Sequence, residues 1–358
     1  MSHAPSPSLT NLVGASPADL AALLDGLDSR PYRVRQIYHW LNRRLAASLD
    51  EMTDLPKSLR AALAERASVV DPAVADARRA PDGTVKVALR LDDGAVVEAV
   101  VIPMEGRTTL CLSSQAGCAV GCVFCVTGAL GAGRNLSGGE IFGQYRVLAR
   151  RENLLGQPLN VVFMGMGEPL LNLPGVSRAV DLLAETVSPR RVTVSTSGIV
   201  PMIARLGELP RRPNLAVSLN ATTQEQRVRL MPLASRWTLD ELLEALRRYP
   251  LERGRRITIE YVLLAGLNDS EEDARRLPRL LRGVPVKVNV IPFNPDSEFL
   301  PDLATPDEAT VNRFAARLAD AHLNVTVRWS KGLEVSGACG QLRGRVSPAP
   351  PEPSADAH

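Results

Sequence analysis

Three cysteines within eight residues constrain this 358-residue chain more than any other feature of its sequence. Cys118, Cys122 and Cys125 follow a strand-like run, and at this spacing their thiolates can converge on one soft metal centre. A zinc site would need a fourth ligand nearby, but no histidine lies between His39 and His322. Three thiolates without a fourth ligand favour a [4Fe–4S] cluster with one iron left open, and three ordinary structural cysteines are the alternative.

The two remaining cysteines do not fit this cluster. Cys111 lies seven residues before Cys118, and Cys339 stands far downstream. A free cysteine is commonly a small buried hydrophobe, which is the simplest interpretation of either residue. Gly337 and Gly340 around Cys339 nevertheless indicate an exposed turn, where a thiolate can react.

The composition narrows the class of protein. Hydrophobic residues make up 45% of the chain, and 42 basic against 39 acidic residues leave a net charge of +3, which excludes a disordered or polybasic tail protein. The length suggests two domains of roughly 100–200 residues each. No apolar run reaches the about 18 residues of a membrane-spanning helix, and Met1–Ser16 lacks an apolar signal core. Five sparse cysteines fit a reducing compartment, so we expect a cytoplasmic protein that does not bind membranes.

Arginine dominates the basic residues, with 38 arginines against four lysines. Its planar fork suits phosphate, although codon bias in an arginine-rich proteome is the simpler explanation of this ratio. Five of them gather in one N-terminal stretch: Arg30, Arg33, Arg35, Arg43 and Arg44. These arginines form either a solvated helix face or a surface that docks RNA.

The N-terminal part predicts a small helical unit followed by a hairpin. The expected helices cover residues 17–27, 32–47 and 55–65. Thr84–Leu91 and Ala95–Ile102 read as two strands joined by a tight turn. We therefore expect a helical accessory domain over residues 1–80 and a β-hairpin over residues 81–107 that extends the next domain.

From residue 108 onwards, strands and helices alternate. The expected strands are Thr108–Leu112, Asn160–Phe163, Arg191–Ser195, Asn214–Leu219, Arg256–Leu264, Val286–Ile291 and Asn324–Val327. The expected helices are Gly138–Arg151, Val176–Glu185, Leu239–Arg248, Ser270–Leu281 and Pro306–His322. About six strand–helix units predict an α/β fold with parallel strands, a partial (βα)6-type TIM barrel over residues 108–345. Its chemistry would lie at the C-terminal ends of the strands, and residues 346–358 would form a disordered tail.

Several separate segments resemble one known family. The cysteine spacing is that of the radical S-adenosylmethionine (SAM) superfamily, and the surrounding sequence is similar to the RlmN methyltransferases. The matching segments are Tyr32-Arg-Val-Arg-Gln-Ile-Tyr38, Leu55-Pro-Lys57, Thr109-Leu-Cys-Leu-Ser-Ser-Gln-Ala-Gly-Cys-Ala-Val-Gly-Cys-Val-Phe-Cys125, Arg134-Asn-Leu136, Glu140-Ile141, Gly165-Met-Gly-Glu-Pro-Leu-Leu-Asn172, Val192-Thr-Val-Ser-Thr-Ser-Gly198, Ala216-Val-Ser-Leu-Asn-Ala221 and Ala338-Cys-Gly-Gln-Leu342. The resemblance covers roughly residues 17–345, and its motifs keep their order.

This resemblance implies an activity, its cofactors and its partners. RlmN-like enzymes methylate carbon 2 of adenine 2503 in 23S rRNA and in some cases adenine 37 of tRNA, so we expect both RNAs as partners of this chain. Two SAM molecules and a [4Fe–4S] cluster on Cys118, Cys122 and Cys125 would serve as cofactors. An electron donor such as flavodoxin would reduce the cluster, and the enzyme would act as a monomer.

The resemblance also implies roles for three residues. Cys339 would take a methyl group from one SAM, and a radical derived from a second SAM would activate that group for addition to carbon 2. Glu98 would remove the carbon-2 proton, and Cys111 would attack Cys339 to release the product as a transient disulfide forms. Without the resemblance, Glu98 would be interpreted as a solvent-facing strand residue, because it alternates with apolar neighbours.

By resemblance, a further set of residues would contact SAM. These are Gly167, Glu168, Ser195, Ser218, Leu219, Asn220 and Asn294. Glycines before Glu168 would let SAM approach the backbone closely, and Glu168 would accept a hydrogen bond from its ammonium group. Two positions depart from the family pattern, since Asn220 stands where many members have histidine and Val126 replaces a usual alanine.

Three other functions stay open. A Cfr-type enzyme methylates carbon 8 of the same adenine and shares both extra cysteines, although Pro169 after the Gly-Glu pair favours carbon 2. A radical SAM activase acting on a protein would need neither Cys111 nor Cys339. An RNA-binding protein with a cluster and no catalysis would produce no 5′-deoxyadenosine.

Overall fold

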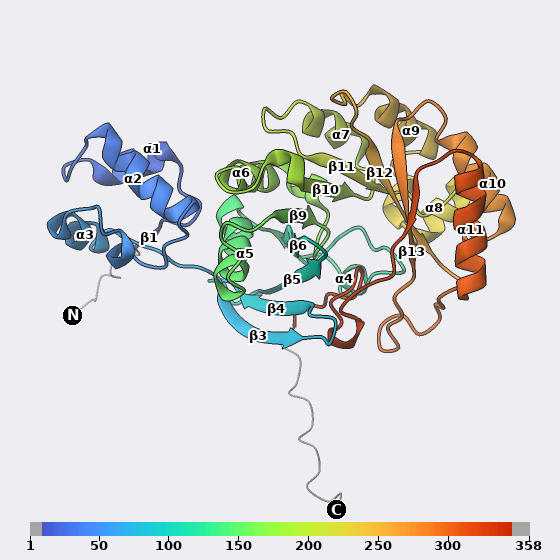
Figure 1. The fold of residues 1–358 in the computed structure, drawn as a ribbon, viewed down its shortest axis with the longest axis horizontal. Coiled ribbons are helices and arrows are strands. Elements are labelled where there is room, and N and C mark those ends of the chain that lie inside the picture. Colours follow the sequence, from blue (N-terminus) through green and yellow to red (C-terminus); the bar gives the residue numbers. More distant parts are fainter. Residues whose placement is uncertain (1–8, 346–358) are drawn as a thin grey trace, which may run out of the picture.

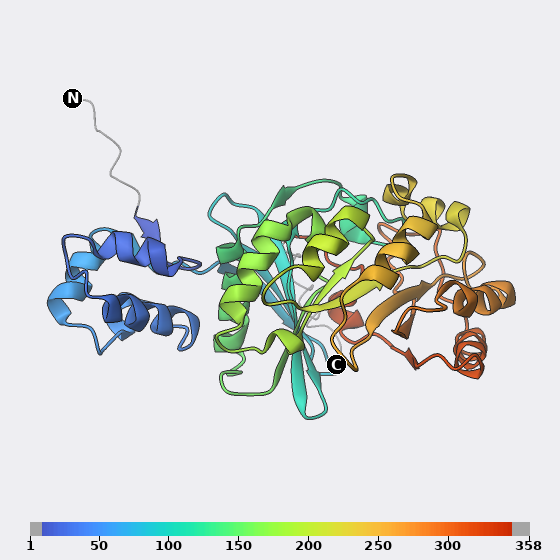
Figure 2. The same ribbon diagram turned by 90° about the horizontal axis from the view of Figure 1, so that it is seen from above.

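Capping residues fix where the N-terminal helices begin. The computed structural model describes residues 9–345, and its first helix begins at a capping box in which Ser16 and Asp19 exchange hydrogen bonds. The elements of this unit are β1 (Thr10–Asn11), α1 (Pro17–Leu24), α2 (Pro31–Asn42), α3 (Lys57–Ala64) and β2 (Ala67–Ser68). The two strands pair in parallel, and Leu20, Ile37 and Leu59 belong to a core of its own. This accessory domain lies apart from the sheet domain in Figures 1 and 2.

A ten-stranded sheet organises the rest of the chain (Figure 1). Neighbouring parallel strands, in sheet order, are β6 (Arg107–Cys111), β9 (Leu159–Phe163), β10 (Val192–Thr196), β11 (Asn214–Ser218), β12 (Ile257–Leu263), β13 (Val286–Pro292) and β14 (Val325–Val327). Each expected strand appears within two residues of its predicted bounds. The curved, open sheet of parallel strands confirms the prediction of a partial barrel.

Helices follow most of the parallel strands and lie on the outside of the curved sheet (Figures 1 and 2). They are α5 (Gly138–Arg151), α6 (Leu173–Leu183), α7 (Val200–Gly207), α8 (Gln224–Leu230), α9 (Leu239–Arg248), α10 (Glu271–Leu280) and α11 (Glu308–Asp320). Shorter elements are α4 (Val126–Ala129), the strand pair β7 (Gln115–Ala116) and β8 (Arg134–Asn135), and 3-10 turns at Leu49–Glu51, Pro169–Asn172, Pro189–Arg191, Pro232–Ser235 and Leu333–Val335. None of the helices within residues 9–345 has the length and apolar character needed to cross a membrane.

Three antiparallel strands extend the barrel sheet at the β6 edge. They are β3 (Ala73–Arg79), β4 (Val85–Arg90) and β5 (Val96–Met104). The expected hairpin corresponds to β4 and β5, whereas β3 was not predicted because its run of alanines, one aspartate and two arginines has no strand-like alternation. Since β3 pairs with β4, the packing divides the chain near residue 70 and not at residue 80. The predicted tail over residues 346–358 lies outside the described residues.

Two arginines of α5 join the accessory domain to the barrel. The Arg146 side chain has no exposed surface, and its Nε lies 2.6 Å from an Asp71 carboxylate oxygen. Arg146 also donates to the main-chain carbonyls of Leu41, in the last turn of α2, and of Ala46, in the segment that follows α2. Arg150 adds bonds to Asp71 at 2.7 Å and to the Leu45 carbonyl at 3.1 Å. The barrel therefore satisfies one carbonyl at the C-terminus of α2 and two in the segment that follows it.

Candidate active site

One pocket opens at the C-terminal ends of the parallel strands. Most of the residues predicted for the site line it: Cys118, Cys122, Cys125, Gly167, Glu168, Ser195, Ser218, Asn294 and Cys339. They come from the loop after β7, from the ends of β9, β10, β11 and β13, and from the segment after β14. Cys111, Glu98, Leu219 and Asn220 do not line this pocket.

The cysteine loop, residues 118–125, is held by main-chain hydrogen bonds from three directions. Cys118 N donates to Gly131 O at 2.8 Å, Val123 N donates to Leu230 O at 3.0 Å, and Val126 N just after the loop donates to Gly340 O at 2.7 Å. The loop is thereby tied both to the end of α8 and to the turn that carries Cys339.

The three thiols of this loop fit an iron–sulfur cluster. Burial raises the pKa of Cys118 to about 12 and also raises the pKa values of Cys122 and Cys125, so these thiols ionise only when positive charge is supplied. Within residues 9–345 no three His, Cys, Asp or Glu side chains are arranged around a point where one metal ion would sit. Cysteines that bind a cluster attach to different irons, so their sulfurs need not meet at one point.

Gly167 and Glu168 shape the pocket where β9 ends. Gly167 has φ of +98°, and a Cβ there would lie 2.5 Å from Cβ of Gln115, so only glycine fits. The buried Glu168 carboxylate accepts hydrogen bonds from Ser197 N at 2.6 Å and Leu170 N at 3.0 Å. Burial nevertheless raises the pKa of Glu168, so a cationic ligand group beside it would favour the charged form.

Leu219 and Asn220 turn their side chains away from the pocket. Both are fully buried, and Asn220 takes the left-handed conformation with φ of +56°, which asparagine tolerates well. Asn220 Oδ1 accepts a hydrogen bond from Val262 N at 2.8 Å, and its Nδ2 lies 3.4 Å from Met231 Sδ. The side chain of Asn220 thus stabilises the loop, and only its main chain is left to face a ligand.

Cys339 stands in a turn whose accessible surface faces the pocket. The residue is exposed, as its glycine neighbours predicted, and Asn294 Nδ2 fixes the turn by donating to Cys339 O at 2.9 Å. Protein around the thiol raises its pKa, which the positive charge of Arg328 opposes and the negative charge of Glu260 reinforces. Both of these charged residues line the same pocket.

Cys111 is a buried free thiol at the end of β6. Burial raises its pKa strongly, and the charge of Cys339 adds to the increase. The structure describes both cysteines as free.

Glu98 faces the interior of the molecule, with 1% of its surface exposed. Its Oε1 pairs with Lys86 Nζ at 3.0 Å, and its Oε2 accepts hydrogen bonds from Arg343 N at 2.6 Å and Gly344 N at 3.3 Å. The solvent-facing interpretation is wrong because β4 and β5 are covered on both faces, so alternation along the strand does not indicate exposure. Glu98 therefore holds the segment that follows Cys339.

Sequence reasoning missed Glu260 and Arg328. Glu260 lies in the middle of β12, 4% exposed, in register with Ser218 on one side and Asn289 on the other. Asn289 Nδ2 lies 3.0 and 3.1 Å from its two carboxylate oxygens, and burial raises the pKa of Glu260. A glutamate among apolar residues of a predicted buried strand is the signal that could have identified it.

The N-terminal arginines are only partly available to a partner. Arg33 is buried and, like Arg30, pairs with Asp28, and this holds the pKa of Asp28 well below its usual range. Arg44 stacks over Trp40 with 4.3 Å between its guanidinium carbon and the ring centre. Arg35, Arg43 and Arg44 are exposed and stay candidates for an RNA-docking face.

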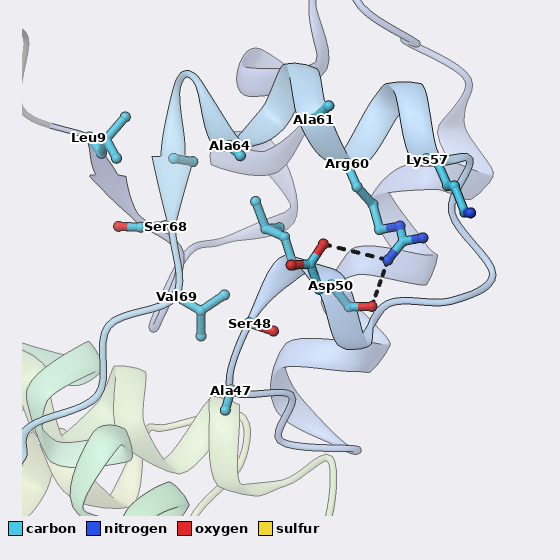
Figure 3. Close-up of a pocket in the computed structure, with 12 residues that line it drawn as sticks. Leu9, Ala47, Ser48, Asp50, Lys57, Arg60, Ala61, Ala64, Ser68 and Val69 are labelled. Atoms are coloured by element: carbon cyan, nitrogen blue, oxygen red, sulfur yellow. Dashed lines mark hydrogen bonds and ion pairs between the residues drawn. The ribbon is translucent and has the colours of Figure 1, made fainter.

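The accessory domain also has an open groove of about 550 Å³ between α3 and the Leu49–Glu51 turn (Figure 3). Figure 3 shows Arg60 pointing toward Asp50 there, with Arg60 NH1 donating to Asp50 O at 2.6 Å. Lys57 stands at the edge of the groove. None of the residues predicted for catalysis lies in it.

Family profiles match this chain in two separate parts. The profile of the radical SAM superfamily matches residues 112–277. The profile described as the ribosomal RNA large subunit methyltransferase N-terminal domain matches residues 10–69. The second match ends just before β3, where the packing also divides the chain.

Similar proteins cover nearly the whole chain. The Dual-specificity RNA methyltransferase RlmN of Anaeromyxobacter dehalogenans is 48% identical over 93% of this chain and 91% of its own length. The protein of the same name from Anaeromyxobacter sp. is 50% identical over 97% of this chain and 93% of its own length. The crystal structure of a radical SAM methyltransferase from Sphaerobacter thermophilus superimposes with a TM-score of 0.88 at 44% identity, covering 94% of this chain and 100% of that one.

Proposed function

The chain belongs to the RlmN family of radical SAM RNA methyltransferases, and on that basis we propose that it methylates carbon 2 of adenine 2503 in 23S rRNA and adenine 37 in some tRNAs. The observation that carries the proposal is the position of Cys339. This residue lines the same pocket as the three cysteines of the cysteine loop and as Glu168. An activase or a non-catalytic RNA-binding protein has no use for a reactive thiol at that place.

Cys339 accepts the first methyl group. Its thiolate attacks the methyl carbon of SAM, so that a sulfur–carbon bond forms while S-adenosylhomocysteine leaves. Asn294 orients the turn by holding the Cys339 carbonyl, and Arg328 favours the thiolate. Glu168, whose carboxylate is fixed by two main-chain donors, receives the ammonium group of SAM.

The methylated Cys339 then becomes the reagent. Cys118, Cys122 and Cys125 would hold an iron–sulfur cluster, which would supply the electron that converts a second SAM into a 5′-deoxyadenosyl radical. Cys339 gives up one hydrogen of its methyl group to that radical, and its carbon adds to carbon 2 of the adenine. The RNA is now linked covalently to the chain.

Glu98 and Cys111 complete the reaction. Glu98 takes the carbon-2 proton after leaving the Arg343 and Gly344 amides, which lie on the same segment as Cys339. The adduct still carries one unpaired electron, and the cluster that Cys118, Cys122 and Cys125 would hold would take that electron back. Cys111 attacks the sulfur of Cys339, which forms a disulfide and breaks the bond to the product carbon, and that carbon takes up a proton.

We further propose that the partners are those expected of the family. A single chain contributes all of the proposed site residues, which supports action as a monomer. Reduced flavodoxin fits the need for a one-electron donor, and the reducing cytoplasm protects both the cluster and the thiols.

An anaerobic assay on an unmodified 23S rRNA fragment tests this function. Reconstituted enzyme, SAM and a reductant should produce 5′-deoxyadenosine and 2-methyladenosine at one position, and Cys339→Ala should produce no methylated RNA. Nuclease digestion with mass spectrometry identifies the methylated carbon. A methyl group on carbon 8 alone, or full RNA methylation by Cys339→Ala, would contradict the proposal.

A further inference from the structure

Arg227 is a buried cation without an acidic partner. The residue lies on α8 and is 2% exposed. Among residues 9–345, no carboxylate oxygen lies within the 4.0 Å of an ion pair from its guanidinium. Burying an unpaired charge is costly, so such a residue is retained only where something compensates it.

Arg146, the other fully buried arginine of the described residues, shows how a buried positive charge is usually compensated. Arg146 is also enclosed, but Asp71 lies 2.6 Å from its Nε and neutralises it. Arg227 has main-chain carbonyls instead, since it donates to Ser197 O at 2.5 Å, to Ser218 O at 3.1 Å and to Leu219 O. Carbonyl oxygens satisfy its N–H groups but leave its positive charge uncompensated.

These carbonyls belong to the two loops that line the proposed SAM site. Ser197 follows β10, and Ser218 ends β11. The Ser197 peptide lies between two charged side chains, because its N–H donates to Glu168 at 2.6 Å while its carbonyl accepts from Arg227. Arg227 thus holds the Ser197 peptide in place, and that peptide in turn orients the Glu168 carboxylate.

The helix that carries Arg227 also holds the cysteine loop. Val123 N donates to Leu230 O at the last residue of α8, and Leu230 packs in one apolar cluster with Val126 and Cys122. Ser197 and Ser218, whose carbonyls hold the guanidinium of Arg227, line the same pocket as Cys122. The unpaired cation therefore lies directly behind the wall of the pocket that contains the proposed cluster ligands.

We propose that Arg227 is a positioning residue that provides the fixed positive charge opposite the iron–sulfur cluster and joins the SAM-binding loops after β10 and β11. This inference rests on the proposed function, because it requires the cluster. Reduction adds one negative charge to a cluster already bound by three thiolates. A nearby buried cation stabilises that added charge and raises the reduction potential, which makes electron entry easier.

The test compares variants that separate charge from hydrogen bonding. Arg227→Lys keeps the charge, Arg227→Gln keeps donors for the carbonyls without the charge, and Arg227→Met removes both. Arg229→Met, at an exposed position on the same helix, is the matched control. Each protein is reconstituted anaerobically, its iron and sulfide content are measured, and its midpoint potential is determined by a redox titration monitored by electron paramagnetic resonance.

The expected order of potentials follows the charge. Wild type, Arg227→Lys and Arg229→Met should have similar midpoint potentials, while Arg227→Gln and Arg227→Met should shift to more negative values at similar iron content. Equal potentials in wild type and Arg227→Gln would overturn the inference while leaving the proposed function intact. Failure of the wild type to bind a cluster would instead overturn the proposed function.

Discussion

At the scale of single residues, the candidate site is built mostly from side chains that are already committed to partners. Glu168 accepts two main-chain N–H groups, Glu98 is paired with Lys86, and Asn294 holds the Cys339 carbonyl. Cys339 is the exception, with its surface open to the pocket. The fixed groups preorganise the site, and the free thiol is the group that we propose to react.

Methyl transfer to Cys339 should accelerate with pH. Enclosure raises the pKa of this thiol above its ordinary value, so at neutral pH the thiolate is a small fraction, which grows about tenfold per pH unit. Mass spectrometry of the peptide containing residue 339, after incubation with SAM between pH 7 and pH 9, measures the rate. Cys339→Ala provides the blank, and a rate that stays flat over this range would contradict a raised pKa.

The free energy of unfolding should fall more when one partner of the Lys86–Glu98 pair is replaced than when both are replaced. Lys86→Met leaves the Glu98 carboxylate buried without its cation, and breaking such a pair costs about 3–5 kcal/mol. The double variant Lys86→Met with Glu98→Gln has no uncompensated charge and should recover part of that loss. Urea unfolding followed by circular dichroism compares the three proteins, and equal loss in both variants would show that charge is not the cause.

At the scale of elements, helices whose bounds follow from periodicity and capping residues can be predicted from the sequence. Elements that depend on tertiary contacts cannot. The bounds of α5 and α9 agree with prediction because each begins at a capping box. α7 and α8, with 8 and 7 residues, were not predicted, whereas α1 and α3, with 8 residues each, were, so length alone does not account for the omission.

The candidate site shows the same division. The cysteine loop and the Gly167-Glu168 turn could be proposed from the sequence because their chemistry is local in sequence, and the structure places both in one pocket. Arg227 and Glu260 were not, because an arginine on a short helix or a glutamate in a strand is ordinarily exposed. The fold shows that both are buried, Glu260 in the lining of the pocket and Arg227 behind Ser197 and Ser218, which also line it.

The Gly167 turn provides a test at the element scale. Gly167→Ala and Gly156→Ala both place alanine at a positive φ, which costs roughly 1–2 kcal/mol in either case. Only at Gly167 would the new methyl group meet Gln115, whereas Gly156 has open space around it. We expect Gly167→Ala to lose SAM binding in isothermal titration calorimetry and Gly156→Ala to retain it. Normal SAM affinity in Gly167→Ala would show that this turn does not shape the SAM site.

At the scale of the whole molecule, the accessory domain and the barrel are connected by buried polar contacts of α5. Gly139 and Gly143 bring α5 close to the other unit, because a Cβ would lie 2.5 Å from Val13 O and 2.6 Å from Pro72 Cδ, respectively. Arg146 and Arg150 bind Asp71 between the domains. A fixed joint would set the distance between an RNA-docking face and the pocket.

Replacement of Arg146 should therefore weaken the use of the RNA substrate more than the reaction with SAM. Arg146→Met removes the contacts to Asp71, Leu41 and Ala46, so amide hydrogen exchange at the end of α2 should increase. The KM for the rRNA fragment should rise several-fold, while 5′-deoxyadenosine formation without RNA stays at the wild-type rate. An unchanged KM with faster exchange would mean that the joint does not position the RNA.

The covalent route through Cys339 is tested most directly by an isotope-labelled single turnover. Enzyme whose Cys339 carries a trideuterated methyl group is mixed with unlabelled SAM, reductant and the rRNA fragment, and both products are analysed by mass spectrometry. We predict that the RNA methyl group retains two deuterium atoms and that 5′-deoxyadenosine gains one, because the hydrogen is removed from the methyl group on Cys339. An unlabelled methyl group on the RNA would show that the carbon comes directly from SAM and would contradict the mechanism.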